Sequence, residues 1–377
     1  MTDAANPLDQ NHTDPAAPRI GVFTRLLEQA SPADRYRFAL EQIEAAERAG
    51  FASAWIAQHH FHEAEGGLPS PFVLLGAAAQ RTSRIGLGTA VVTLPIDDPL
   101  RVAEDAVVVD ALSGGRVQLG LATGGTPSSF TAFGRSFDER RAVFGEHFAV
   151  LLDALEGRGI RGSDETLYPA GGDLAERIWQ ATFSVPGAVA AGTRGDGLML
   201  SRTQPRPEGR PDATLADIQL PVIAAYREAL PAGVSPRVLA SRTALVVDEH
   251  NRGGVGDYVG EALRKLVRQF VGVDPSGLSL AELFAVTDTH VGTADEVAAS
   301  LAADATLAEA TDISFQVHSI DAPHEWTLRS IELLATEVAP RLGWQVGPAS
   351  ADQLRDAHRA HTTSAFAAGL APERGES

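Results

Sequence analysis

The feature that most constrains the fold is a regular alternation of short apolar runs and helical segments over residues 19–155. The four apolar runs are Ile20–Phe23, Ala52–Ala57, Ile85–Val92 and Val117–Leu121. A segment with helix signals follows each of them. This alternation is typical of parallel strands joined by helical crossovers. A parallel sheet covered by helices is therefore the predicted scaffold.

The first helix carries signals at both of its ends. Ser31 is a good N-cap, Pro32 suits the first helical position, and Asp34 places an acid in the first turn. Gly50 suits the left-handed position just after a helix. Further helices are expected over residues 71–81, 100–112 and 137–155, with a loop at 123–134.

The later chain repeats the pattern less cleanly. Strands are expected at 178–181, 197–201, 238–247 and 313–317, with helices near 186, 213–229, 258–269 and 327–338. Eight strands favour a (β/α)8 TIM barrel with insertions over an open doubly wound sheet. The first strand leads into Thr24-Arg25-Leu26-Leu27 rather than a G-x-G-x-x-G turn, which weakens a Rossmann interpretation.

Composition divides the chain into a barrel and two tails. Residues 1–18 are expected to be a flexible arm, 19–345 the barrel, and 346–377 a tail with a helix near 352–360. Three stretches rich in Gly, Pro or charge interrupt the barrel at 157–173, 203–212 and 271–280. They are interpreted as lids or pocket walls at the catalytic mouth, or alternatively as plain surface insertions.

Charge and residue usage exclude several classes of function. Lys and Arg number 31 against 49 Asp and Glu, a net charge of −18, so nucleic acid and anionic membranes are poor partners. Cysteine is absent, which excludes disulfides, thiolate nucleophiles and Cys-ligated zinc. No apolar run approaches the ~20 residues of a membrane span, and no signal peptide is visible. A cytoplasmic protein is expected.

The densest polar cluster is Gln58-His59-His60-Phe61-His62-Glu63, directly after the second predicted strand. In a barrel this position lies on the catalytic face. Imidazoles titrate near neutrality, which suits acid–base work. Two alternatives remain: hydrogen-bonded loop residues without chemistry, and a metal site completed by Asp110 or Asp196. The metal site is the less favoured, because the spacing is not H-E-x-x-H and no ligand-type carboxylate recurs at later strand ends.

The loop after the fourth strand reads Thr123-Gly124-Gly125-Thr126-Pro127-Ser128-Ser129. Small residues such as Gly124 let backbone amides approach a ligand, and hydroxyls such as that of Thr123 donate to phosphate or to a flavin edge. The loop lacks the G-K-[ST] of a P-loop. It is a candidate cofactor-binding segment.

Two further residues stand at helix starts beside strands. Ser184 precedes Val185-Pro186-Gly187 and is either an anion-binding residue or a simple helix cap. Arg101 either binds a phosphate bidentately or forms a surface ion pair with Glu104 or Asp105.

Four segments then match a known pattern in the right order. Residues 54–61, 87–95, 98–105 and 112–116 resemble the bacterial luciferase-like flavin-dependent monooxygenases. The resemblance is specific over residues 19–155 and looser through 179–202 and 291–297, where the family has a late helix start.

The resemblance implies a barrel that binds FMN at its carboxyl-terminal mouth. It implies oxygenation of a small aldehyde, alkane or sulfonate with O2 and with reduced flavin from a separate flavin reductase, usually by a homodimer. His59, with His60 beside it, matches the catalytic position. Ala90 and Val91 match a peptide that is often cis.

The resemblance also assigns phosphate-binding roles to Arg101 and Ser184. The sequence departs from the family pattern at two positions. Gln58 replaces an acid, which should leave His59 less readily protonated, and Thr123 replaces an arginine. The hypothesis is a two-component FMN-dependent monooxygenase. The alternatives are a deazaflavin-dependent oxidoreductase on the same barrel and a non-catalytic flavin-binding protein.

Overall fold

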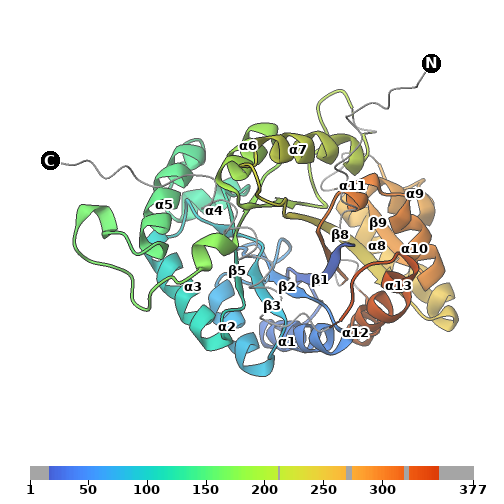
Figure 1. Ribbon diagram of the computed structural model, residues 1–377. Helices are drawn as coiled ribbons and strands as arrows, with labels where there is room; N and C mark the ends of the chain where they lie inside the picture. Colours follow the sequence, from blue (N-terminus) through green and yellow to red (C-terminus); the bar gives the residue numbers. More distant parts are fainter. Residues whose placement is uncertain (1–16, 211–212, 269–273, 318–321, 348–377) are drawn as a thin grey trace, which may run out of the picture.

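The structure, a computed structural model, describes residues 17–210, 213–268, 274–317 and 322–347. They form a closed parallel barrel ringed by helices (Figure 1). Its eight wall strands are β1 (Arg19–Thr24), β2 (Ser53–Ile56), β3 (Gly86–Thr89), β5 (Val117–Ala122), β6 (Ile178–Ala181), β7 (Gly197–Leu200), β8 (Val238–Val246) and β10 (Asp312–Gln316). The predicted (β/α)8 barrel is confirmed.

The last wall strand closes the barrel by pairing on both sides. In β10, Ile313 is opposite Ile20 of β1 and also opposite Ala240 of β8. Two short strands lie off this path. The strand β4 (Val92–Thr93) pairs with the end of β5, and β9 (Thr289–Gly292) pairs with the second half of β8.

The helices form the outer layer, as Figure 1 shows. The longer ones are α1 (Pro32–Ala49), α2 (Pro71–Arg81), α3 (Pro99–Ser113), α5 (Arg140–Leu155), α6 (Val185–Arg194), α7 (Leu215–Ala229), α8 (Val255–Leu266), α10 (Ala294–Ala302) and α12 (His324–Leu333). The expected caps of α1 are present. The Ser31 side chain accepts a hydrogen bond from the Asp34 amide, and Gly50 has a φ of 87°.

Among the elements that differ from the sequence-based expectation, three lie beside the strand ends or the barrel wall. The strand predicted over residues 85–92 is broken after Thr89, and the peptide between Ala90 and Val91 is cis. The loop predicted at 123–134 contains a short helix, α4 (Pro127–Ala132). The strand β9 was missed because its four residues precede the helix signal Thr293-Ala294, the N-cap and first residue of α10.

Two tryptophans fill the barrel interior. Trp55 and Trp179 meet edge to face with ring centroids 5.5 Å apart. A Cβ atom on Gly88 or Gly197 would lie 2.2 Å from one of these rings, so both positions must be glycine. The indoles pack with Met199 and Leu239, which completes one apolar interior cluster.

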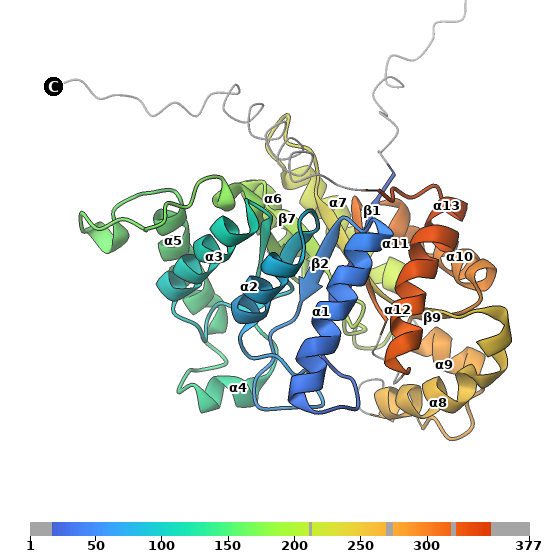
Figure 2. The ribbon, with the colours of Figure 1, turned by 90° about the horizontal axis from the view of Figure 1, so that it is seen from below.

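The connections after strands and after helices lie at opposite ends of the barrel. Figure 2 shows α4 and α8, which follow β5 and β8, at the lower edge, which is the carboxyl end. The stretch 157–173 joins α5 to β6 and projects at the upper left. The expectation that it could border the catalytic mouth is therefore wrong, because a segment between a helix and the next strand returns to the amino end.

Parts of several expectations fall outside the described residues. These are the arm up to residue 16, the tail from 348 including the helix near 352–360, and residues 211–212 and 271–273. No described helix is long and apolar enough to cross a membrane.

Candidate active site

His59 lies just past the carboxyl end of β2, as predicted for a catalytic position. Its backbone amide donates to the Leu68 carbonyl at 2.9 Å, and its Nδ1 lies 3.8 Å from the Glu65 carboxylate. Gly66 covers the ring so closely that a Cβ atom there would lie 2.5 Å from Cδ2 of His59. The imidazole is held in place and its side chain is 25% exposed.

The His59 ring is neutral at physiological pH. Burial, then the nearby Arg25 cation and then His60 lower the pKa of His59 to about 3. The lowered pKa agrees with the expectation that Gln58 leaves His59 less readily protonated. Its main causes, however, are burial and the Arg25 cation. A neutral imidazole offers one N–H donor and one lone pair. It can therefore accept a proton or hold a substrate, rather than supply a proton as a cation.

Gln58 is a structural crosslink at the rim. Its side-chain carbonyl accepts from the Thr93 amide at 2.8 Å, and its Nε2 donates to Asp97 at 2.9 Å. These bonds fasten the end of β2 to β4 and to the segment before α3. An amide can donate and accept at once, which an ionised acid at this position could not do.

The other two histidines of the cluster face the α4 region. The His60 ring meets Phe133 edge to face at 4.9 Å, and burial lowers the pKa of His60. Its Nε2 is buried and makes no hydrogen bond within the part of the chain that the structure describes. His62 Nε2 lies 2.7 Å from the Ser128 hydroxyl. The three imidazoles thus have different neighbours.

The metal alternative finds no support in the described ranges, where no group of three His, Asp or Glu side chains could hold an ion. Asp110 instead makes two hydrogen bonds of 2.7 Å to the buried Arg177. Asp196 is bound by Arg194 and Gln180. Both carboxylates are structural.

Ser184 forms a hydroxyl cradle at the start of α6. Its Oγ accepts from the Gly187 amide at 3.3 Å and lies 3.2 Å from the Thr182 hydroxyl. A Cβ atom on Gly187 would lie 2.2 Å from Thr182 Oγ1, so only glycine keeps the cradle open. Two hydroxyl donors at a helix N-terminus are a donor set that fits a phosphate group.

A cavity of about 360 Å³ adjoins this cradle. Its lining includes Phe183 and Val185, which flank Ser184. From the predicted pocket wall it includes Gln204, Pro205, Pro207 and Arg210. This lining agrees with the interpretation of residues 203–212 as a pocket wall, which stays a prediction.

Arg101 lies where the surface alternative predicted. Its side chain is 68% exposed and pairs with Glu104 and Asp105 on its own helix, α3. No hydrogen bond or ion pair of the described residues joins Arg101 to Ser184.

The loop after β5 contacts residues 58–65, the segment that carries the three histidines and is named here the histidine loop. Thr126 Oγ1 donates to the Glu65 carboxylate at 2.9 Å. Gly124 has a φ of 80° and lies so close to Thr93 that a Cβ atom would be 2.4 Å from its methyl group. Thr123 is half-buried. Thr123 and Gly124 therefore border the same rim as His59.

Two arginines at this end were missed, the half-buried Arg25 and the buried Arg202. Arg25 follows β1 and donates to the Glu65 carbonyl, and Arg202 follows β7 and is 5% exposed. The only available signal was an arginine directly after a predicted strand. That signal does not distinguish a buried guanidinium from a surface one.

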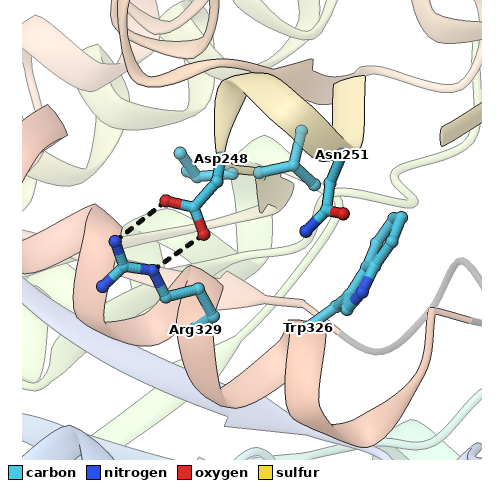
Figure 3. Close-up of a pocket in the computed structure, with 6 residues that line it drawn as sticks. Asp248, Asn251, Trp326 and Arg329 are labelled. Carbon is cyan, nitrogen blue, oxygen red and sulfur yellow. Dashed lines mark hydrogen bonds and ion pairs between the residues drawn. The ribbon is translucent and has the colours of Figure 1, made fainter. Parts of the chain in front are cut away.

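The small pocket in Figure 3 is not a substrate site. Asp248, Asn251, Trp326 and Arg329 border a cavity of about 20 Å³ beside the end of β8. Arg329 binds Asp248 through two hydrogen bonds of 3.0 and 2.9 Å. The space holds about one water molecule.

Comparison with known proteins gives a consistent picture. Residues 19–311 match the family model described as luciferase-like monooxygenase. The chain is 39% identical over 126 residues to the uncharacterized protein y4vJ of Sinorhizobium fredii, covering 33% of this chain and 36% of that protein. It is 34% identical over 177 residues to limonene 1,2-monooxygenase of Rhodococcus erythropolis, covering 44% of this chain and 45% of that enzyme. The chain thus spans less than half the length of these curated relatives.

Solved structures share the fold over nearly their whole length. The oxygenating constituent of 3,6-diketocamphane monooxygenase from Pseudomonas putida, solved with FMN, has a TM-score of 0.70 at 19% identity, covering 86% of this chain and 98% of that one. An F420-dependent secondary alcohol dehydrogenase, solved with an F420–acetone adduct, has a TM-score of 0.63 at 20% identity, covering 86% and 99%. Identities this low show the barrel fold alone.

Proposed function

Because the chain belongs to the luciferase-like monooxygenase family, we propose that it is an FMN-dependent, two-component monooxygenase. It takes reduced FMN from a separate flavin reductase and uses O2 to oxygenate a small organic substrate, such as an aldehyde or alkane derivative. The observation that carries this proposal is the Thr182–Ser184 cradle, which fits the phosphate of FMN, at the same end of the barrel as His59. A cytoplasmic location fits a partner that draws on soluble reductant.

Reduced FMN, when bound, supplies two electrons, so that one atom of O2 enters the substrate and the other leaves as water. The chain positions the reactants. Ser184 and Thr182 bind the phosphate, and the half-buried Ala90 and Val91 offer an apolar surface at the interior end of the barrel. Thr123 and Gly124 border the mouth beside them.

His59 acts on protons in this proposal. Its neutral ring accepts a proton from the substrate or orients it through a hydrogen bond, with His60 packed alongside. The rim built from α4 and the histidine loop limits the access of water, because Glu65–Thr126 and His62–Ser128 bonds join the two segments.

The proposed function is tested by measuring substrate turnover with a known electron donor. Purified protein is given FMN, a flavin reductase with its reductant, 18O2 and a panel of aldehydes. One labelled oxygen atom in the product supports the monooxygenase. Substrate oxidation that needs a deazaflavin and no O2 would instead support the deazaflavin-dependent alternative. Tight flavin binding without turnover of any aldehyde in the panel would support the alternative of a non-catalytic flavin-binding protein.

Removing the Ser184 hydroxyl should weaken FMN binding. We expect Ser184→Ala to raise the Kd for FMN roughly tenfold, since a hydrogen bond to a charged group contributes about 1.5–3 kcal/mol. The measurement is a fluorescence titration of FMN, with riboflavin as the matched ligand that lacks the phosphate. Riboflavin affinity should not change. An equal loss for both flavins would contradict the assignment of the phosphate to this cradle.

Arg101→Ala in the same titration decides the role of this arginine. A phosphate contact requires its guanidinium to leave Glu104 and Asp105. A selective loss of FMN over riboflavin would demonstrate that contact. Unchanged affinity for both ligands would assign Arg101 to the surface ion pairs.

The exposed side of α2 and α3 supports a homodimer. Val73 of α2 and Val108 and Leu112 of α3 are 76%, 46% and 53% exposed on helices that pack against each other. A second copy would cover this apolar surface. We expect Val108→Asp to raise the dimer dissociation constant at least tenfold in analytical ultracentrifugation. The control is Val189→Asp, at an exposed valine of α6. A dimer that persists unchanged in Val108→Asp would contradict this interface.

A further inference from the structure

The barrel interior has two unlike walls. One is apolar and contains Trp55 and Trp179. The other carries polar side chains on the adjacent strands β8 and β10. Side chains alternate along a strand. Ile313 and Phe315 pack into the outer core, so Ser314 and Gln316 point to the interior.

The same alternation places Ser241 and Thr243 of β8 on the interior face, because Leu239 packs in the tryptophan cluster. The register sets Ser241 opposite Ser314 and Thr243 opposite Gln316. Ser241 Oγ, Thr243 Oγ1, Ser314 Oγ and Gln316 Nε2 are all buried without a hydrogen-bond partner in the described part of the chain. Buried polar atoms are normally bonded. Four unbonded atoms on two paired strands therefore point to a missing ligand.

Arg202 completes this set at the end of β7. Its Nε donates to Gln316 Oε1 at 2.7 Å, and its Nη2 is buried and has no hydrogen-bond partner within the described ranges. Asp288 is the acidic neighbour that acts on it electrostatically, but its carboxylate binds Arg206. Since Arg202 occupies the Gln316 carbonyl, Gln316 presents only its N–H groups. The whole set can donate hydrogen bonds.

The Arg25 guanidinium links this set to His59. It acts electrostatically both on His59 and on Arg202. Burial, followed by Arg25, lowers the pKa of Arg202 to about 9, so Arg202 is still charged at pH 7. Phe23 and Ser241, on the interior face, are half-buried as residues, whereas most of their strand neighbours are fully buried. The polar wall and His59 belong to one mouth.

We propose that Arg202, Gln316, Thr243, Ser241 and Ser314, named here the polar wall, bind a carboxylate on the organic substrate. The substrate is then an organic acid whose oxidisable carbon lies toward His59, rather than a neutral alkanal. A guanidinium with amide and hydroxyl donors around it matches the oxygens of a carboxylate. This inference rests on the proposed function and names the substrate class of that site.

The test is binding of three matched six-carbon probes, hexanoate, hexane-1-sulfonate and 1-hexanol, by isothermal titration calorimetry without flavin. We expect hexanoate to bind at least tenfold more tightly than hexanol. Arg202→Met should weaken hexanoate binding ten- to hundredfold and leave hexanol unchanged. Arg161→Met, at an exposed arginine, is the control. Hexane-1-sulfonate binding more tightly than hexanoate would overturn the carboxylate assignment, and weaker sulfonate binding supports it.

Thermal stability separates a ligand site from a structural role. A buried charge without a bonded carboxylate destabilises the protein, so Arg202→Met should raise Tm. Gln316→Glu supplies an internal carboxylate and should raise Tm while abolishing hexanoate binding. A lower Tm of Arg202→Met with unchanged hexanoate affinity would overturn the proposal.

The two proposals fail in different measurements. Hexanoate binding is read without flavin, and FMN affinity and 18O incorporation are read separately. A protein that binds hexanoate through Arg202 but neither binds FMN nor incorporates oxygen refutes the proposed function alone.

Discussion

Replacing His59 with alanine is expected to lower product formation by ~10²–10⁴-fold, the usual contribution of a positioned acid or base. FMN should still bind, because the phosphate cradle lies on a different strand end. Electrons from reduced flavin should then reach O2 without oxygenating the substrate, and hydrogen peroxide should accumulate. The measurement is product and peroxide formed per reduced flavin consumed.

His250→Ala is the matched control, since His250 is an exposed histidine on the connection between β8 and α8, outside residues 58–63. It should keep the wild-type ratio of product to peroxide. If His59→Ala keeps that ratio as well, His59 is a structural loop residue. Because burial lowers the pKa of His59 to about 3, the wild-type rate should also show no His59 ionisation near pH 6.5.

The same pKa shift has a consequence for stability. The unfolded chain protonates His59 near its ordinary pKa of 6.5, whereas the folded protein resists protonation down to about 3. The stabilising contribution is therefore complete above pH 6.5 and is lost as the pH falls from 6.5 toward 3. His59→Ala should lose less stability over this window than the wild type, as measured by denaturant unfolding.

Asp110→Ala is expected to cause the largest loss of stability, ~1–3 kcal/mol, because it removes two hydrogen bonds from a buried guanidinium that keeps, among the described residues, only Asp173 as a carboxylate partner. Arg177 is 1% exposed and binds Asp110 through both terminal nitrogens at 2.7 Å. Asp110 also accepts from the Val117 amide at 3.0 Å, so it joins α3, β5 and the segment before β6. Thermal or urea unfolding measures the effect.

The control is Asp164→Ala, at an exposed acid, which should stay within ~0.5 kcal/mol of the wild type. FMN affinity of folded Asp110→Ala should be unchanged, because the Asp110–Arg177 pair precedes the start of β6 rather than its carboxyl end. Unchanged stability together with a loss of activity would indicate that Asp110 has a role at the site, as in the metal alternative.

Local signals predicted much of the architecture. The caps Ser31 and Gly50 of α1 were identified because capping depends on neighbours within four residues. The wall strands were identified because a buried parallel strand is a continuous apolar run. The loop 157–173 was misplaced, although its position between a helix and a strand already assigned it to the amino end.

The site was only partly predictable, because the protonation and the contacts of its residues depend on groups far apart in the sequence. A strand end followed by His59 is visible in the sequence, and so is Ser184 before a helix. The neutral state of His59 depends on burial and on Arg25, which approaches only when β1 and β2 pair. For Arg101 the sequence left a phosphate contact and a surface ion pair open, and the structure shows the contacts with Glu104 and Asp105.

The sequence by itself determined the order of strands and helices, the family, and the strand end that carries His59, because each depends on residues close together in the chain. Only the tertiary structure decided which charges meet inside. Closing the barrel pairs β10 with both β1 and β8 and brings Arg202 against Gln316. The physical reason is that desolvation and Coulomb interaction depend on distance in space. A local sequence pattern does not predict the distance between two charged side chains that come together only when the first and last strands pair.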